Sequence, residues 1–262
     1  MKHVQLSDMA TMAYQSIGDG PPLVLIHAPG IGSVNFSYQL PLAKSYRLLI
    51  PDLLGHGESS PAREAFTLTK LAADIRAMLD AEHVEQASIC GYSQGGSIAL
   101  ECLLAYPERF NGAILVSSFS EVNDLYLHAR FFLAEALSSM QGAKWLAHST
   151  AHSHLEDPHE QKRWIAHAEK TDGYSLHQMY LAGHHYSCTD KLHTISSPVM
   201  LVYGEDDRPM HSYAHLLHHK LPHAQLHLIP GTKHQVITKA PAAFHKLCDS
   251  FLSSLPTASL TS

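Results

Sequence analysis

The chain has 262 residues, of which 45% are hydrophobic and 16% are charged. This apolar share is large enough for a sizeable buried core, and it excludes global disorder, because disordered chains are charge-rich and poor in apolar residues. The formal net charge is −6, whereas nucleic-acid-binding proteins usually carry a basic excess. We therefore expect no nucleic-acid partner.

The sequence shows no clear membrane span, signal peptide or disulfide pattern. No apolar run approaches the roughly 18 residues that a membrane span needs, and the N-terminus lacks the regions of a signal peptide. The four cysteines lie far apart and form no CxxC pair, so neither a disulfide framework nor a thiolate zinc site is expected. We expect a cytoplasmic globular protein without a membrane partner, and the sequence is silent on its oligomeric state.

Short apolar runs of strand length alternate with amphipathic stretches of helix length. The expected strands are residues 3–6, 11–16, 23–27, 47–51, 87–91, 112–117, 198–203 and 225–229. Most are nearly continuous apolar runs, which is typical of parallel strands covered on both faces, while the first two are more polar and are expected at an antiparallel edge. Helices are expected over residues 68–79, 97–106, 214–221 and 241–252. This alternation predicts a parallel α/β sheet.

The alternation stops between residues 119 and 193, where the sequence indicates several helices and loops without a clear strand. This stretch contains both tryptophans, Trp145 and Trp164, and several other aromatic residues. We interpret it as a helical lid inserted into a core that consists of residues 1–118 and 194–255. Residues 256–262 are mostly small and polar, and we expect a frayed tail there.

The stretch Gly91-Tyr92-Ser93-Gln94-Gly95 carries the strongest chemical signal. It follows an expected strand and precedes an expected helix. A serine on such a tight turn exposes its hydroxyl, small residues on both sides let the backbone pass closely, and the N-terminus of the helix stabilises negative charge. Ser93 is therefore the candidate nucleophile.

A serine nucleophile needs a base, and the base needs an acid that orients it. The expected chain order is serine, acid and then histidine. The stretch Tyr203-Gly204-Glu205-Asp206-Asp207 places acidic residues at the end of an expected strand, and His234 follows the next strand. Both loops are expected at the same edge of the sheet as Ser93, where open α/β sheets bind their ligands.

With these motifs the chain resembles the α/β-hydrolase-fold superfamily over nearly its whole length. The resemblance rests on the Ser93 turn, the late acid and histidine, and two loops, His27-Ala28-Pro29-Gly30-Ile31-Gly32 and Asp52-Leu53-Leu54-Gly55-His56-Gly57-Glu58-Ser59. It implies an α/β-hydrolase fold, which is a mostly parallel eight-stranded sheet flanked by helices, with an inserted helical lid. It selects Asp207, three residues after the glycine, as the acid, with Asp206 as the neighbouring alternative.

The resemblance also implies a mechanism that needs no metal and no cofactor. Ser93 attacks a carbonyl, His234 takes the serine proton and returns it to the leaving group, and Asp207 holds the imidazole tautomer. Water then repeats the cycle on the acyl-enzyme. His27 and His56 are expected to shape their loops through hydrogen bonds to the backbone, not to transfer protons.

Two positions depart from the family pattern. The family usually takes an oxyanion-hole amide from the residue that here is Pro29, and proline has no amide hydrogen. The Gln94 amide remains as one donor, and the second must come from Ala28 or Gly30, from water, or from nothing. Loss of one donor costs about 10²–10³ in rate, so weak activity on ordinary esters is one outcome. Lys233 also stands where a glycine commonly precedes the histidine.

The expected lid bears on the substrate, which we take to be a small molecule. Pro29, Trp145 and Trp164 are candidate substrate contacts. Aromatic side chains that face the site would favour an apolar acyl part or an aromatic part in the substrate. Packing of each ring against the sheet is the alternative.

Histidine is unusually frequent, with 22 residues. Two groups could bind a metal: His211, His215 and His219 at helical spacing on an expected helix, with His218 alongside, and the cluster His148, His152, His154 and His159. No acidic residue or cysteine joins either group at convincing ligand spacing, so solvated histidine-rich faces are favoured and no metal is expected.

The sequence thus predicts a serine hydrolase that acts on a small to medium carboxylic ester or a related acyl compound. Lactonases, hydrolases that cleave a carbon–carbon bond and cofactor-free perhydrolases use the same triad, and the fold does not choose among them. A ligand receptor that kept the hydrolase fold is the alternative from another class, and the Pro29 departure is the feature that raises it.

Overall fold

Eight strands form one sheet within the residues that the computed structural model describes, which are 1–7, 9–140 and 142–256. Residues 257–262 of the expected tail lie outside this part of the chain. The strands are β1 (Lys2–Gln5), β2 (Thr11–Ile17), β3 (Pro22–Ile26), β4 (Arg47–Pro51), β5 (Ala87–Tyr92), β6 (Phe110–Val116), β7 (Val199–Gly204) and β8 (Ala224–Ile229).

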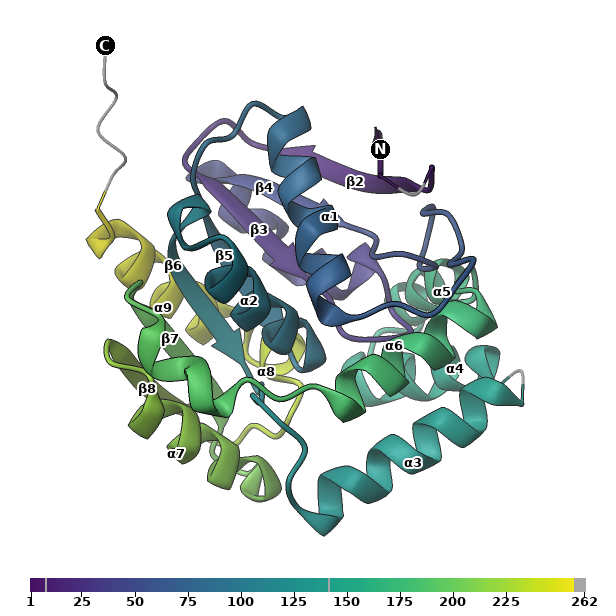
Figure 1. Cartoon of the computed structure of the whole chain (residues 1–262). Helices are drawn as coiled ribbons and strands as arrows, with labels where there is room; N and C mark the ends of the chain where they lie inside the picture. Colours follow the sequence, from purple (N-terminus) through teal and green to yellow (C-terminus); the bar gives the residue numbers. More distant parts are fainter. Residues whose placement is uncertain (8, 141, 257–262) are drawn as a thin grey trace.

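Helices connect the strands and cover the sheet (Figure 1). The α-helices are α1 (Leu68–Ala81), α2 (Gln94–Ala105), α3 (Leu125–Ser139), α4 (Ala143–His154), α5 (Pro158–Ala168), α6 (Gly173–His185), α7 (His211–Lys220), α8 (Val236–Lys239) and α9 (Pro241–Ser254). The 3₁₀ segments are η1 (Ser33–Lys44), η2 (Pro107–Arg109), η3 (Thr189–Thr194) and η4 (Arg208–Met210). None of the helices in the described ranges is both long and apolar enough to cross a membrane.

The strand order is β1-β2-β4-β3-β5-β6-β7-β8. Strand β2 pairs antiparallel with both β1 and β4, and the pairs from β4 to β8 are parallel. The prediction of a mostly parallel eight-stranded sheet with an antiparallel edge is therefore confirmed. Helix α2 begins at Gln94, three residues before the expected start, because the turn at Ser93 leads directly into the helix.

The chain reverses its direction of travel across the sheet at β3. Strand β4 lies on one side of β3 and β5 on the other. Ile26 pairs with Gly91, so the loop after β3 and the turn after β5 leave the sheet at the same level. Such a switch point leaves a crevice at the carboxyl ends of the strands, where α/β proteins bind ligands.

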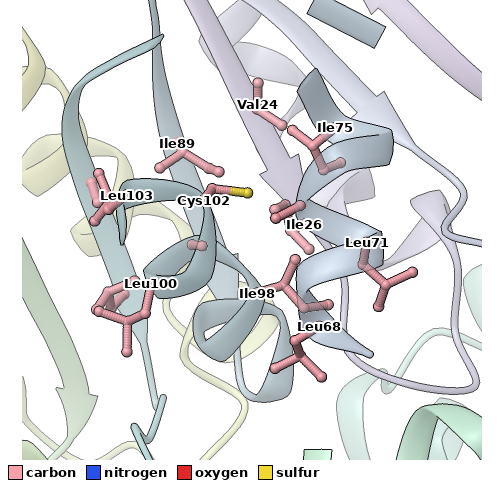
Figure 2. Packing of buried hydrophobic residues seen from close by; sticks show 14 of the residues in the cluster. Val24, Ile26, Leu68, Leu71, Ile75, Ile89, Ile98, Leu100, Cys102 and Leu103 are labelled. Atoms are coloured by element: carbon pink, nitrogen blue, oxygen red, sulfur yellow. The ribbon is translucent and has the colours of Figure 1, made fainter. Parts of the chain in front are cut away.

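Alternate side chains of the strands enter two hydrophobic clusters, one on each face of the sheet. Figure 2 shows part of the first cluster, in which Val24, Ile26 and Ile89 face α1 and α2. Leu23 and Leu25 belong to the second cluster, which α9 and η1 cover. Because both faces are buried, the strands read as continuous apolar runs in the sequence.

Helices α3–α6, residues 125–185, form what we call the helical layer. They lie together at the end of the sheet toward which β3 and β6 point (Figure 1). Within the layer, α3 packs against α6 and α4 against α5. An antiparallel bridge between Glu121 and Ser187 brings the two ends of the layer together. Residues of the layer line one cavity together with residues of the segments that follow β5, β7 and β8.

Leu71 of α1 tests the account of the core, because its side chain is fully buried in the first cluster (Figure 2). Leu71→Ala should lower the free energy of unfolding by about 2–5 kcal/mol, since it removes buried methyl groups and leaves a cavity. Leu125→Ala, at a leucine that is 89% exposed, is the matched control and should change it by less than about 0.5 kcal/mol. Urea unfolding followed by circular dichroism measures both, and equal losses would contradict this account.

Candidate active site

Ser93 occupies a strained turn between β5 and α2. Its backbone angles are φ 55° and ψ −125°, a region that residues with a side chain rarely adopt. The Ser93 N–H donates to the Val116 carbonyl at 2.8 Å, and the Gly96 N–H donates to the Ser93 carbonyl at 2.9 Å. These bonds to the neighbouring strand and to the first turn of the helix stabilise the strained conformation of Ser93. The Ser93 hydroxyl is thereby exposed at the end of the sheet.

Two glycines make this turn possible. A Cβ atom on Gly91 would lie 2.3 Å from the carbonyl oxygen of Gly95, and a Cβ atom on Gly95 would lie 2.3 Å from the carbonyl oxygen of Ile26. Both distances are far below van der Waals contact with backbone atoms that cannot move aside. Any side chain at either position would push α2 away from β3 and β5.

His234 lies between the serine and a carboxylate. Its Nε2 is 3.1 Å from Ser93 Oγ, and its Nδ1 is 2.8 Å from Asp207 Oδ2. A carboxylate that accepts from Nδ1–H leaves Nε2 free to accept the serine proton. Asp207 is buried, whereas Asp206 is exposed on the same loop. The structure therefore brings together Ser93, His234 and Asp207, and leaves the alternative acid at the surface.

The loops that carry the acid and the histidine are tied to each other and to β6. The Asp206 N–H donates to the Thr232 carbonyl at 2.9 Å. Ser117, which follows β6 with a positive φ of 49°, donates its hydroxyl to the His234 carbonyl at 3.2 Å. Sequence reasoning missed Ser117, because only its place at the end of a strand distinguishes it from other serines.

His27 and His56 lie fully buried beside each other, with ring centroids 4.9 Å apart. His27 Nε2 accepts from the Leu53 N–H at 2.9 Å, and its Nδ1 binds the Ala28 carbonyl at 2.8 Å. His56 Nε2 accepts from the Gly30 N–H at 3.0 Å. Both rings bind backbone groups, as expected of residues that shape loops.

The amides that were expected to complete an oxyanion hole are engaged elsewhere. The Ala28 N–H donates to Asn35 Oδ1 at 3.1 Å, and the Gly30 N–H donates to His56. Of the sources considered for the second donor, Ala28 and Gly30 are therefore excluded in this loop conformation, because neither N–H is available. Gln94 opens α2, where backbone N–H groups lack an intrahelical partner, so its amide remains the candidate donor.

Ser93 and His234 border a cavity of about 480 Å³. Pro29, a predicted substrate contact, lines it next to the nucleophile. Helix α3 supplies most of an apolar wall, and α4 supplies a wall that is rich in hydroxyl groups. The apolar wall includes Leu127, Phe131, Leu133 and Leu137, and the polar wall includes Ser149, Thr150, Ser153 and His154.

The two tryptophans of the helical layer differ in their surroundings. Trp145 lines the cavity and is 58% exposed. Trp164 is 1% exposed, packs on His154 with ring centroids 4.9 Å apart, and donates its indole N–H to Thr150 Oγ1 at 3.2 Å. The prediction that Trp164 contacts substrate is therefore wrong, because this ring fills the contact between α4 and α5.

His154 is a cavity residue that sequence reasoning treated only as one of a histidine group. Its Nε2 lies 3.4 Å from the Tyr92 hydroxyl, and its Nδ1 lies 3.1 Å from Thr238 Oγ1. Burial, with a smaller contribution from the charge of nearby His234, lowers the pKa of His154 to about 3. The described residues contain no group of three or more histidine, cysteine or acidic side chains that could hold a metal ion.

Comparisons with known proteins agree with this fold. A family model described as alpha/beta hydrolase fold matches residues 21–241. A proposed carbamate hydrolase, RutD of Azorhizobium caulinodans, is 26% identical over 254 residues, which cover 91% of this chain and 93% of that protein.

Solved structures match nearly the whole chain. A hydrolase from Pseudomonas aeruginosa PA01 has a TM-score of 0.82 and 25% identity, and the match covers 97% of this chain and 98% of that one. An esterase from Exiguobacterium antarcticum has a TM-score of 0.87 at 20% identity, over 97% of this chain and 99% of that one. At that identity the esterase supports the fold alone.

The buried histidines predict how stability depends on pH. Burial lowers the pKa of His27 to about 3, of His56 to about 4 and of His154 to about 3, so these rings stay neutral in the folded protein. In the unfolded chain they take up protons as the pH falls below about 6.5. The free energy of unfolding should therefore be greatest above that pH and should fall towards pH 4, each ring contributing a slope of about 1.4 kcal/mol per pH unit.

Urea unfolding at several pH values between 4 and 7 measures this slope. His154→Gln should reduce this slope by about 1.4 kcal/mol per pH unit, because glutamine does not titrate. A slope that stays as steep in the variant as in the original protein would show that His154 does not stay neutral in the folded state.

Proposed function

The chain belongs to the alpha/beta hydrolase family, and we propose that it is a serine hydrolase that cleaves a small to medium carboxylic ester or a related acyl compound. One observation carries the proposal: Ser93 Oγ, the His234 imidazole and the Asp207 carboxylate form a hydrogen-bonded row at the border of a cavity. The hydrolases among the similar proteins support hydrolysis as the reaction type.

In the proposed reaction, His234 Nε2 accepts the Ser93 proton while Ser93 Oγ attacks the ester carbonyl. Asp207 keeps Nδ1 protonated and stabilises the imidazolium that forms. The imidazolium then protonates the departing alcohol, which leaves the acyl group on Ser93. Water loses a proton to His234, attacks the acyl carbonyl and releases the acid. The Gln94 N–H and the N-terminus of α2 face the negative charge that develops on the carbonyl oxygen.

The engaged amides of Ala28 and Gly30 bear on the rate of this reaction. With both occupied, the oxyanion has one backbone donor, and the loss of one donor costs about 10²–10³ in rate. We therefore expect kcat below that of an esterase with two donors, and faster turnover of esters whose leaving group needs little stabilisation.

The same amides favour a second candidate function, in which the protein binds a small acyl compound without turning it over. A receptor needs the cavity but not the oxyanion donors. The cavity of about 480 Å³ falls in the range of small-molecule sites and suits either function. Turnover that depends on Ser93 separates the two candidates.

The nucleophile is tested by Ser93→Ala. Hydrolysis of p-nitrophenyl butyrate should fall by about 10⁴-fold or more, because the acyl-enzyme no longer forms. Ser253→Ala, the same substitution at an exposed serine of α9, should leave the rate unchanged. A fluorophosphonate probe should label the original protein and the control but not Ser93→Ala. Unchanged turnover in Ser93→Ala would reject this serine, and no turnover by any form would favour the receptor.

The acid is tested by a pair of adjacent substitutions. Asp207→Asn should lower kcat by about 10⁴-fold, because an amide no longer holds the reactive imidazole tautomer. Asp206→Asn should leave kcat near its original value, since that side chain is exposed while Asp207 binds His234. Steady-state kinetics on p-nitrophenyl butyrate compare the two variants. A larger loss in Asp206→Asn would reverse the assignment of the acid.

A further inference from the structure

Arg130 differs from the other described residues that line the cavity, because it alone carries a permanent charge. It extends from α3, where its neighbours in the wall are the apolar side chains of Leu127, Phe131 and Leu133. No aspartate, glutamate or lysine is among the described lining residues. The cavity therefore has one cationic point in an apolar surface.

The partners of Arg130 leave its charge uncompensated. Its Nη1 donates to the Tyr126 hydroxyl at 3.1 Å, and its guanidinium carbon lies 5.6 Å from the centre of the Tyr126 ring. In the described parts of the chain, no carboxylate lies within 4.0 Å of its guanidinium nitrogens. Glu135, further along the same helix, binds His184 at 2.6 Å instead. A guanidinium has five donors, so most remain free for a ligand.

The electrostatic effect of Arg130 reaches the interior of the cavity. Burial raises the pKa of Tyr180 to about 12 and that of Tyr92 further above its usual range, and the positive charge of Arg130 opposes both increases. Tyr180 and Tyr92 line the same cavity, and Tyr92 directly precedes the nucleophile. The positive charge of Arg130 therefore reaches two hydroxyl groups of this cavity.

We propose that Arg130 forms an anion subsite and that the preferred substrate is an ester that also carries a carboxylate. This proposal rests on the proposed ester hydrolysis. The guanidinium binds the carboxylate, for which its planar fork is suited. The apolar wall contacts the methylene chain that separates the carboxylate from the ester carbonyl at Ser93. The carboxylate belongs to either the acyl part or the alcohol part of the ester.

Each source of the carboxylate has a matched pair of substrates that differ in charge but not in shape. Monomethyl adipate and methyl adipamate carry the charged and the neutral group on the acyl part. 5-Acetoxypentanoate and 5-acetoxypentanamide carry them on the alcohol part. Release of methanol or acetate gives kcat and KM for each compound.

We expect kcat/KM for the acid to exceed that for the amide about tenfold in one of the two pairs. This modest factor follows from the exposure of Arg130, since exposed charges interact weakly through solvent. The preference should act mainly through KM, because the charge lies away from the reacting atoms. It should shrink in about 0.5 M salt, which screens the attraction.

Variants at two arginines locate the preference. Arg130→Met should abolish the preference, so that the acid and the amide are turned over with similar kcat/KM, and Arg130→Lys should retain part of the preference. Arg163→Met is the control, because Arg163 lies on α5 outside the cavity and pairs with Glu160 at 3.0 Å. This control should keep the full preference.

The outcomes separate this proposal from the proposed function. Turnover of the esters without a preference for either acid, or a preference that survives in Arg130→Met, overturns the subsite and leaves ester hydrolysis standing. Binding to Ser93→Ala, measured by calorimetry, needs no turnover. Tighter binding of an acid than of its amide, lost in the Ser93→Ala, Arg130→Met double variant, supports the subsite even if no ester is hydrolysed. Equal binding of acid and amide overturns it.

Discussion

The close approach of three backbone segments determines the geometry of this site. The end of β3, the end of β5 and the first turn of α2 pass so near one another that Gly91 and Gly95 have no room for a Cβ atom. This contact forces the positive φ of Ser93 and places its hydroxyl beyond the sheet. The His234 and Asp207 loops are then fixed relative to that hydroxyl by bonds to β6 and to each other. The triad is thus a consequence of backbone packing at the point where the strand order reverses.

The loop after β3 is rigid for a different reason. His27 and His56 are neutral because burial disfavours their charged forms, and each accepts a backbone N–H through Nε2. A neutral ring keeps these bonds as the pH changes near neutrality. The bonds hold the loop in one conformation, and that conformation directs the amides of Ala28 and Gly30 into the protein. The hydrogen bonds that order the loop are therefore also the reason why few N–H groups remain for an oxyanion.

Sequence reasoning succeeded where the signal is local. Continuous apolar runs identified the strands, and chain order together with position at strand ends singled out Ser93, Asp207 and His234, which the fold brings together. It failed where tertiary contacts decide whether a side chain is buried or faces the cavity. The face of α5 that meets α4 buries Trp164, and no periodicity in that segment reveals this. Arg130 escaped notice because one arginine on an amphipathic helix has no pattern of its own.

The sheet edge and the helical layer contribute to the site in different ways. The sheet edge positions its reactive groups through backbone hydrogen bonds and through glycines that have no room for a side chain. Substitutions there therefore disturb the chemistry. Helix α3 borders the cavity with side chains alone, and Arg130 can change without moving a loop of the triad. Helix α4 is different, because His154 contacts Tyr92 beside the nucleophile and Thr238 on α8, four residues after the base. Changes on α3 should therefore alter which ester is preferred, whereas a change at His154 would also reach the position of His234.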